Sequence, residues 1–203
     1  MNANKKIATA LWKDNCKINL PCGIGSAVSV TTKIREFIGD QLKNYNIRSI
    51  SDAGCGDFAW MNLVDLGTAT YVGYDINKEM LDVNKTKYPK VSFIEFDLVN
   101  QPLPRTDLII CRDCLFHLPD ASVIKALKLF KASGSPYLMT TSYRNVISNT
   151  PTSSEKFTSK RSLYTSEYGF REINLEKDPF NLSAPLTFIE ESGFKRIFGL
   201  WRL

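Results

Sequence analysis

A glycine-rich turn between two carboxylates carries the clearest chemical signal in this sequence. Gly54 and Gly56 follow a short apolar stretch around Ile50, and glycine adopts backbone angles that side chains forbid, so the turn can press against a bound molecule. Asp52 precedes the turn, and Asp75 ends the next apolar run. A strand-end carboxylate at this separation from the glycines can accept hydrogen bonds from ribose hydroxyls. The spacing predicts a site for a ribose-containing cofactor.

The turn leaves two cofactors to choose between. The pattern Gly54-x-Gly56-x-x-Ala59 satisfies the loose dinucleotide fingerprint, and we expect a helix to open near Asp57, so that its N-terminal end and the turn amides attract an electron-rich or anionic group. These features allow NAD. Asp52 favours S-adenosylmethionine, because a carboxylate beside the turn repels a pyrophosphate and attracts ammonium and sulfonium charges. We therefore predict S-adenosylmethionine.

Four blocks of sequence, in order, resemble the motifs of the class I S-adenosylmethionine-dependent methyltransferases. They are residues 52–56, 73–75, 96–98 and 107–113. The stretches 111–118, 171–175 and 179–180 are similar to a small bacterial and phage subgroup of that family. The resemblance implies a methyltransferase whose cofactor-binding residues are Asp52, Gly54, Cys55, Gly56, Asp57, Asp75, Ile76, Asp97, Leu98 and Arg112.

Some of these positions allow a second interpretation. Asp97 resembles the family position that binds the exocyclic amine of adenine, with Leu98 touching the ring, but it could also be an ordinary strand-end carboxylate. Cys55 could be a small packing residue of the turn.

Two residues near the end of the fourth expected strand are the candidate catalytic groups. Methyl transfer from a sulfonium is a direct displacement, so positioning alone can supply up to ~7 to 11 kcal/mol, and a base is useful only for an acceptor such as a hydroxyl. Asp113 and His117, the single histidine, are placed for that role. Alternatively, Asp113 holds Arg112 or the cofactor's ammonium, and His117 caps a helix or packs under a loop.

The same stretch could be read as a metal site. Cys111, Cys114 and His117 follow one another at three-residue intervals, and thiolates and imidazole bind zinc. However, Cys111 lies inside the expected strand, and no second pair has matching spacing. We predict no metal.

Four polar residues after the fifth expected strand are candidates for binding the acceptor. Fork and amide geometry suit phosphate, carboxylate or sugar hydroxyls, although the same groups could simply hold the loop in place. Positive charge is concentrated in residues 1–48 and 144–171, which fits an anionic acceptor or merely a solvated basic surface. The four candidates are Arg144, Asn149, Arg171 and Asn174.

The apolar periodicity predicts an α/β fold with five parallel strands in a doubly wound sheet and helices on both faces. The methyltransferase resemblance implies a late antiparallel strand near the C-terminus, in a mostly parallel seven-stranded sheet. The expected helices span 26–43, 58–66, 77–87 and a stretch from 119, with a short one over 185–192. The expected strands after the first are 71–75, 91–96, 107–111, 137–143 and 195–202.

The totals favour a single domain over residues 1–203, with 1–24 as an N-terminal flap and 144–180 as a substrate-side loop region. The 203 residues contain five cysteines, an odd number, and no segment typical of a signal peptide or membrane span. We expect a cytoplasmic protein. The Pro-Pro motif of amino-methylating DNA enzymes and a target-recognition domain are lacking, so we expect a small-molecule acceptor and no nucleic-acid partner; the oligomeric state is left open.

Together these features predict a methyltransferase that acts on oxygen or nitrogen of a small polar, possibly anionic metabolite or saccharide. Two other functions stay open at this point. One is a nicotinamide-dependent oxidoreductase of the same fold, and the other is a nucleotide-binding subunit without catalysis.

Overall fold

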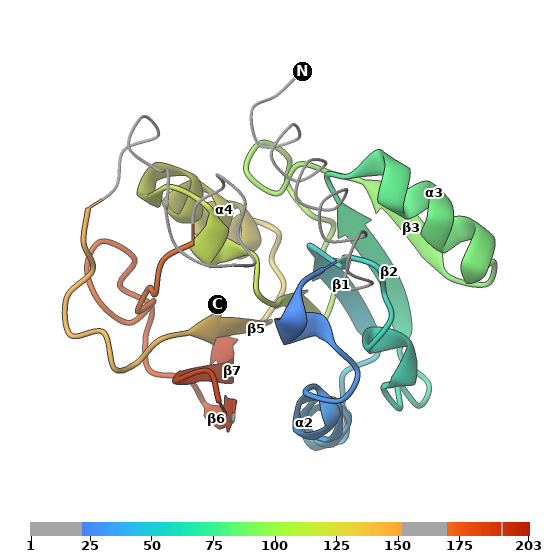
Figure 1. The fold of residues 1–203 in the computed structure, drawn as a ribbon, viewed down its shortest axis with the longest axis horizontal. Coiled ribbons are helices and arrows are strands. Elements are labelled where there is room, and N and C mark those ends of the chain that lie inside the picture. The colour runs from blue at the N-terminus through green and yellow to red at the C-terminus, as the bar shows by residue number, and fades with distance from the viewer. Residues whose placement is uncertain (1–21, 152–169, 192) are drawn as a thin grey trace.

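The computed structural model describes residues 22–151, 170–191 and 193–203. These residues form a seven-stranded sheet in the order β3-β2-β1-β4-β5-β7-β6 (Figure 1). Strands β1 to β5 run parallel to one another, and β7 is antiparallel to both β5 and β6. The predicted sheet with a late antiparallel strand is confirmed. Its strands are β1 (Ser49–Ala53), β2 (Thr70–Asp75), β3 (Ser92–Glu95), β4 (Leu108–Cys111), β5 (Tyr137–Ser142), β6 (Thr187–Glu191) and β7 (Arg196–Arg202).

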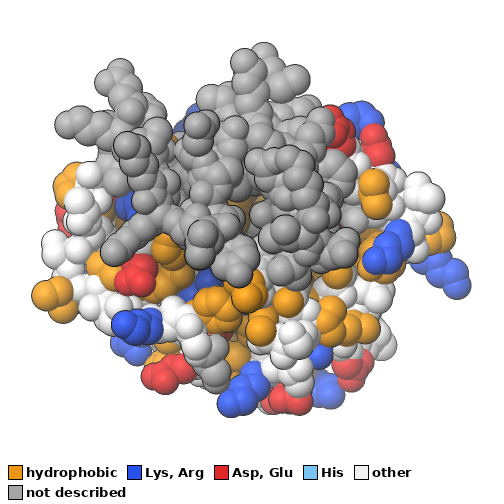
Figure 2. Space-filling view, in the orientation of Figure 1, with side chains coloured by type: hydrophobic (Ala, Val, Ile, Leu, Met, Phe, Trp, Pro, Cys, Tyr) orange, Lys and Arg blue, Asp and Glu red, His pale blue; other side chains and the backbone are white. Residues whose placement is uncertain are grey.

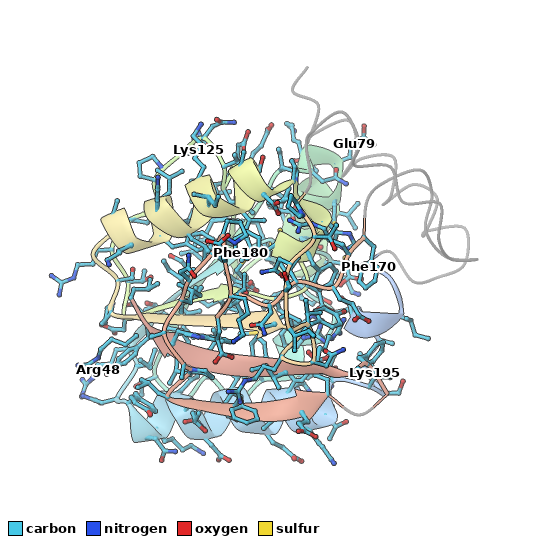
Figure 3. All side chains as sticks on the ribbon, turned by 90° about the vertical axis from the view of Figure 1, so that its left-hand side faces the viewer. Arg48, Glu79, Lys125, Phe170, Phe180 and Lys195 are labelled. Atoms are coloured by element: carbon cyan, nitrogen blue, oxygen red, sulfur yellow. The ribbon has the colours of Figure 1, made fainter. Side chains whose placement is uncertain are left out.

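Helices cover both faces of this sheet. Helices α2 (Thr32–Asn44) and α3 (Lys78–Lys87) share one apolar core with one face, and α4 (Asp120–Ala132) shares the second core with the other. Figure 1 shows α2 and α4 on opposite sides of the strands, and Figure 3 shows the same layers from the side. The central strands β1, β4 and β5 alternate their side chains between the two cores, so the middle of the sheet is buried on both faces, as in parallel sheets.

The strand order places the candidate site. β1 pairs with β2 on one side and β4 on the other, so the chain reverses its direction of winding at β1. In open α/β sheets, ligands bind outside the carboxyl ends of the strands at such a switch point. Asp52 and Asp75 near the ends of β1 and β2, and Asp113 beyond β4, are brought to this one edge.

Two expected helices around the glycine turn are corrected. The helix expected over 26–43 begins only at Thr32, because residues 24–26 form the 3-10 helix η1. The helix expected over 58–66 is reduced to the 3-10 helix η2 (Met61–Leu63). Phe58 has a φ of 57° and packs its ring 5.0 to 5.3 Å from those of Tyr71, Tyr88 and Phe93. Burial of this ring therefore outweighs helical propensity, since a positive φ cannot continue an α-helix.

The short helix expected over 185–192 is wrong. Residues 187–191 form β6, which pairs residue by residue with β7. Ile189 packs against the core on the α2 side, whereas Phe188 is exposed, and this alternation of sides belongs to a strand. Pairing with β7 overrides the proline and glycine signals that flank the segment.

Parts of two expected regions lie outside the described residues, namely most of the flap over 1–24 and the middle of the loop region over 144–180. Within the described ranges, none of the helices is long and apolar enough to cross a membrane.

Candidate functional site

The glycine turn is fastened to the neighbouring strand β2. The amides of Gly54 and Cys55 both donate to the Tyr74 carbonyl, at 2.7 and 3.0 Å, and the amide of Gly56 donates to Asp75 Oδ2 at 3.1 Å. Gly54 and Gly56 have φ values of 92° and 60°, which explains why glycine stands at both positions. The expectation that the turn amides form an anion cradle is therefore wrong, because three of them already have partners.

No α-helix follows the turn within the described residues 57–77, so the expected helix N-terminus near Asp57 is absent as well. The Asp57 amide instead donates to Cys22 Sγ at 3.1 Å, and the Asp57 carboxylate accepts from the Ala59 amide. The turn therefore offers no helix dipole end, and its two glycines leave room for neighbouring side chains: a Cβ would lie 3.2 Å from Cys114 Sγ at Gly54 and 2.7 Å from Cys22 Sγ at Gly56. Cys55 turns its side chain into the core, as its packing alternative predicted.

Asp75 links the end of β2 to both neighbouring turns. Its two oxygens accept the amides of Gly56 and Asn77, at 3.1 and 2.9 Å. Burial raises the pKa of Asp75, and the bonds from backbone amides oppose that rise. Because each carboxylate oxygen has two acceptor positions, capacity for ribose hydroxyls remains. The predicted ribose contact is chemically compatible with this placement and stays a prediction.

Asp52 is a buried carboxyl group near the end of β1. It is 2% exposed, and the Tyr71 hydroxyl donates to its Oδ2 at 2.6 Å. Burial raises the pKa of Asp52 to about 7, helped by the charge of Asp75, while Tyr71 and Arg112 oppose the rise. A group of this kind gains most from a cation brought beside it, since the cation favours its charged form.

Replacing Asp52 by asparagine is expected to raise the free energy of unfolding and to weaken cofactor binding, because the variant has no negative charge to pair with the cofactor's cations. The pKa of Asp52 is higher in the folded than in the unfolded chain, so the folded state binds the extra proton and stability falls as pH rises from about 4 to about 7. At pH 8 the free energy of unfolding of the Asp52→Asn variant should thus be about 2 to 4 kcal/mol higher than that of the parent, and this difference should shrink toward pH 4. Denaturant unfolding at the two pH values measures this. Equal stability at pH 8 would mean that Asp52 ionises freely.

Three further cofactor candidates flank the ends of β2 and β3. Asp97 accepts the Val99 amide at 3.0 Å and the Asn100 side-chain amide at 2.8 Å, so it shapes the turn after β3. Leu98 packs partly against the α4-side core, and Ile76 is half-buried after Asp75. They lie at the correct edge of the sheet, and their contacts with adenine stay predictions.

A cluster of four charged side chains closes the other half of this edge. Glu191 Oε2 accepts from Arg112 at 2.7 Å and from Arg196 at 2.9 Å, and Arg196 also bonds Asp113 Oδ2 at 2.7 Å. The Arg112, Glu191 and Arg196 side chains are each at most 4% exposed. We call these four residues the charge cluster; its charges balance, as burial requires.

The cluster defines what Arg112 and Asp113 can do. Arg112 stacks over Trp60 and donates to Glu191. Asp113 has a φ of 53°, and its Oδ1 accepts from the Thr141 hydroxyl at 2.9 Å. Arg196 and Thr141 both donate to Asp113 and hold its carboxylate in place, and its catalytic role stays a prediction. The alternative in which Asp113 holds Arg112 is supported by their 3.4 Å ion pair.

His117 lies among aromatic rings beyond β4. It ends the 3-10 helix η3 (Leu115–His117), with its ring 4.5 Å from Phe116 and 6.2 Å from Phe170. Phe116 and Phe170 also contact Tyr143 from the end of β5. His117 is half-buried at the same edge as Asp113. Both candidate catalytic residues thus follow β4 at this edge of the sheet, and their roles stay predictions.

The two asparagines among the acceptor candidates hold the backbone of their own region. Asn149 exchanges hydrogen bonds with the Asn174 backbone at 2.9 and 2.8 Å and donates to the Asp178 carbonyl. Asn174 donates to the Val146 carbonyl and accepts the Glu176 amide. The loop-holding alternative accounts for both.

The two arginines also have intramolecular partners. Arg144 pairs with Glu176 at 2.8 Å and is partly exposed, and Arg171 is bound to Asp120 and to the Leu118 carbonyl near η3. Figure 3 shows Phe180, over which Arg171 stacks, on the α4 side of the sheet. Acidic and basic side chains are interspersed along the rim of the face in Figure 2, with hydrophobic side chains toward its middle. An acceptor role for the arginines stays a prediction.

Sequence reasoning missed five residues that build this edge. Tyr71 donates to Asp52, and Glu191 and Arg196 complete the charge cluster. Cys22 contacts the glycine turn, and Gly25 contacts the charge cluster. Tyr71 precedes Gly73, the register partner of Asp52, by two residues, so it lies on the same face of the sheet as a neighbour of Asp52 on the next strand. The other four meet the site only through distant parts of the chain.

Comparison with known proteins agrees with this architecture. Residues 50–134 match the family described as a methyltransferase domain. No curated protein matches the sequence. Magnesium protoporphyrin IX methyltransferase from Synechocystis PCC 6803, solved with bound S-adenosylmethionine, is 17% identical with a TM-score of 0.63, over 100% of both chains. N-methyltransferase NodS from Bradyrhizobium japonicum WM9, in complex with S-adenosyl-L-homocysteine, is 10% identical with a TM-score of 0.67, over 97% of this chain and 98% of that one.

An S-adenosylmethionine-dependent methyltransferase from Clostridium acetobutylicum ATCC 824 is 16% identical with a TM-score of 0.62, over 100% of this chain and 99% of that one. The chain spans about half the length of some larger structures that it matches, 49% of one and 56% of another. At these identities the structures show the class I fold. With the family match over residues 50–134, the resemblance to methyltransferases and the enzyme class are confirmed, and the predicted cofactor agrees with the ligands of these relatives.

Proposed function

We propose that the protein transfers the methyl group of S-adenosylmethionine to an oxygen or nitrogen atom of a small polar acceptor, a metabolite or a saccharide. The observation that carries the proposal is the pair of carboxylates around the glycine turn. Asp75 fastens the turn to β2 and keeps acceptor capacity for ribose, and Asp52 lies buried with a pKa raised to about 7. A sulfonium and an ammonium group beside Asp52 would stabilise its charged form.

The turn itself argues against a nicotinamide cofactor. A pyrophosphate is normally bound by free amides at the start of a helix. Here the amides of Gly54, Cys55 and Gly56 donate to β2, and the described residues after the turn begin no α-helix before Lys78. The site therefore suits a positively charged cofactor better than one that carries a pyrophosphate.

In this proposal the charge cluster and the aromatic rings around His117 form the acceptor side. S-adenosylmethionine supplies an activated methyl group, so the protein's task is to hold the acceptor atom in line with it. Asp113 is held by Arg196 and Thr141 and serves as a fixed charge. His117 is the group that accepts a proton when the acceptor is a hydroxyl or a protonated amine.

Replacing His117 by glutamine is expected to lower kcat by about 10² to 10⁴-fold, the usual contribution of a general base, while cofactor affinity stays unchanged. Steady-state kinetics and cofactor titration measure the two quantities. An unchanged kcat would show that the acceptor loses its proton to water or needs no base.

The activity is tested with S-adenosylmethionine carrying a deuterated methyl group. The purified chain is incubated with it and with separate sets of sugar, phosphorylated and amine-containing metabolites, and products are identified by mass spectrometry. Transfer of the intact labelled methyl group to one set supports the proposal and names the acceptor class. Cofactor binding without transfer to any set would instead favour a nucleotide-binding subunit.

A further inference from the structure

Residues 22–26 lie across both halves of the candidate site. At one end, Cys22 Sγ accepts the Asp57 amide at 3.1 Å. At the other, Gly25 lies so close to the charge cluster that a Cβ there would be 2.7 Å from Asp113 Oδ2 and 3.1 Å from the nearer Arg196 terminal nitrogen. This short segment, which includes the 3-10 helix η1 (Ile24–Ser26), thus touches the glycine turn and the charge cluster together.

We infer that Gly25 and Cys22 are positioning residues for the methyl donor. They act by holding residues 22–26 in contact with the glycine turn and with Asp113. The inference rests on the proposed function. It assigns to the two residues no contact with the reacting atoms. They hold the glycine turn and the Asp113 carboxylate in one fixed arrangement.

Glycine is needed at position 25 because a side chain would not fit there, and not because the backbone conformation is unusual. Its φ lies outside the left-handed region, so alanine could adopt the same backbone without strain. The obstacle is the contact with Asp113, whose oxygens are fixed by Arg196 and Thr141. Because that carboxylate cannot yield without breaking charged hydrogen bonds, an added methyl group must lift the segment instead.

Cys22 fits the turn as closely from the other end. A Cβ on Gly56 would lie 2.7 Å from Cys22 Sγ, so sulfur fills the space that this glycine leaves. The sulfur accepts the Asp57 amide and lies 3.9 Å from Met80 Sδ on α3. Burial and the neighbouring charge of Asp57 raise the pKa of the Cys22 thiol, so it stays neutral. A neutral sulfur adds no second negative charge beside Asp75.

The two contacts make a prediction that neither would make alone. If residues 22–26 bind to the rest of the protein as one unit, a substitution at Gly25 should also loosen the contact of Cys22 with the glycine turn. It should also weaken donor binding, because the turn loses the partner of its Asp57 amide.

The test uses S-adenosylhomocysteine as the ligand and a thiol reagent, N-ethylmaleimide, as the probe of Cys22. Calorimetry gives the affinity, and peptide mass spectrometry gives the labelling rate of Cys22, with buried Cys111 as the internal reference. We expect Gly25→Ala to bind about tenfold more weakly, the equivalent of one lost hydrogen bond, and to label faster at Cys22. We expect S-adenosylhomocysteine to slow the labelling of Cys22 in the parent chain.

Gly39→Ala is the matched control. Gly39 lies in α2, also outside the left-handed region, and a Cβ there meets only the Asp65 carbonyl at an ordinary 3.7 Å. This variant should match the parent in affinity and in labelling. Cys22→Ser, which keeps a smaller acceptor for the Asp57 amide, should lose less affinity than Cys22→Ala.

Failure of the inference can be told from failure of the proposed function. If the parent chain binds neither S-adenosylmethionine nor S-adenosylhomocysteine, the function fails and the inference fails with it. If the parent binds, but Gly25→Ala and Cys22→Ala bind equally well, the inference is overturned and the function stands. Should Gly25→Ala not fold, ligand-independent labelling of Cys22 in the parent chain would overturn the inference on its own.

Discussion

Replacing Asp75 by alanine is expected to weaken the binding of S-adenosylhomocysteine by at least about 100-fold. The substitution removes the predicted acceptor for ribose hydroxyls and also leaves the amides of Gly56 and Asn77 without their partner. Hydrogen bonds to charged groups contribute about 1.5 to 3 kcal/mol each, so losing these contacts together is enough for an effect of this size. Isothermal titration calorimetry measures the affinity directly.

Two variants separate the ribose contact from damage to the turn. Asp75→Asn keeps an oxygen that can accept one of the two amides, so it should bind more tightly than Asp75→Ala. Asp82→Ala removes an exposed carboxylate on α3, whose partner is Lys78, and should bind like the parent chain. An Asp75→Ala variant that binds with parental affinity would show that Asp75 does not contact the cofactor.

Replacing Glu191 by alanine is expected to lower the free energy of unfolding by about 3 to 5 kcal/mol, the usual cost of breaking a buried ion pair on one side. Glu191 accepts from Arg112 and Arg196 through the same oxygen, and its side chain is 3% exposed. Without it, two buried guanidinium groups share the single carboxylate of Asp113. Denaturant unfolding followed by circular dichroism gives the change.

Glu190→Ala is the matched control for this loss. Glu190 precedes Glu191 in β6 and is exposed, so its removal tests the same strand without touching the charge cluster. Its unfolding free energy should stay close to that of the parent. A Glu191→Ala chain as stable as Glu190→Ala would mean that the cluster adds nothing to the net stability of the fold, so that its four charges serve only the site.

Local patterns were sufficient to predict the parallel strands of the sheet and the carboxylates at their ends. Apolar runs that end in Asp52 and Asp75 predict parallel strands, and strands of this kind bring their carboxyl ends together. The amphipathic face of α2 and the asparagine cap of α3 likewise depend only on neighbouring residues. These elements are encoded within a few turns of the chain, so the sequence is informative about them.

The parts that could not be predicted depend on contacts between distant residues. Arg112 meets Glu191 across 79 positions, Arg196 meets Asp113 across 83, and Cys22 meets Asp57 across 35. The glycine turn misled for a related reason. Its spacing is compatible with a helix start, but burial of Phe58 among three aromatic rings redirects the chain after it. Packing energies of this kind leave no periodic signature in the sequence.

The most direct test of the account is a calorimetric titration of the purified chain with S-adenosylmethionine, S-adenosylhomocysteine and NAD in parallel, at pH 6 and pH 8. If the glycine turn is a methyl-donor site, the two adenosyl sulfur compounds alone should bind saturably. Binding of S-adenosylmethionine should be tighter at pH 8, where Asp52 with its pKa of about 7 is mostly ionised before the cation arrives. Binding of NAD, or of none of the three, would contradict the assignment of the glycine turn and its two carboxylates as a methyl-donor site.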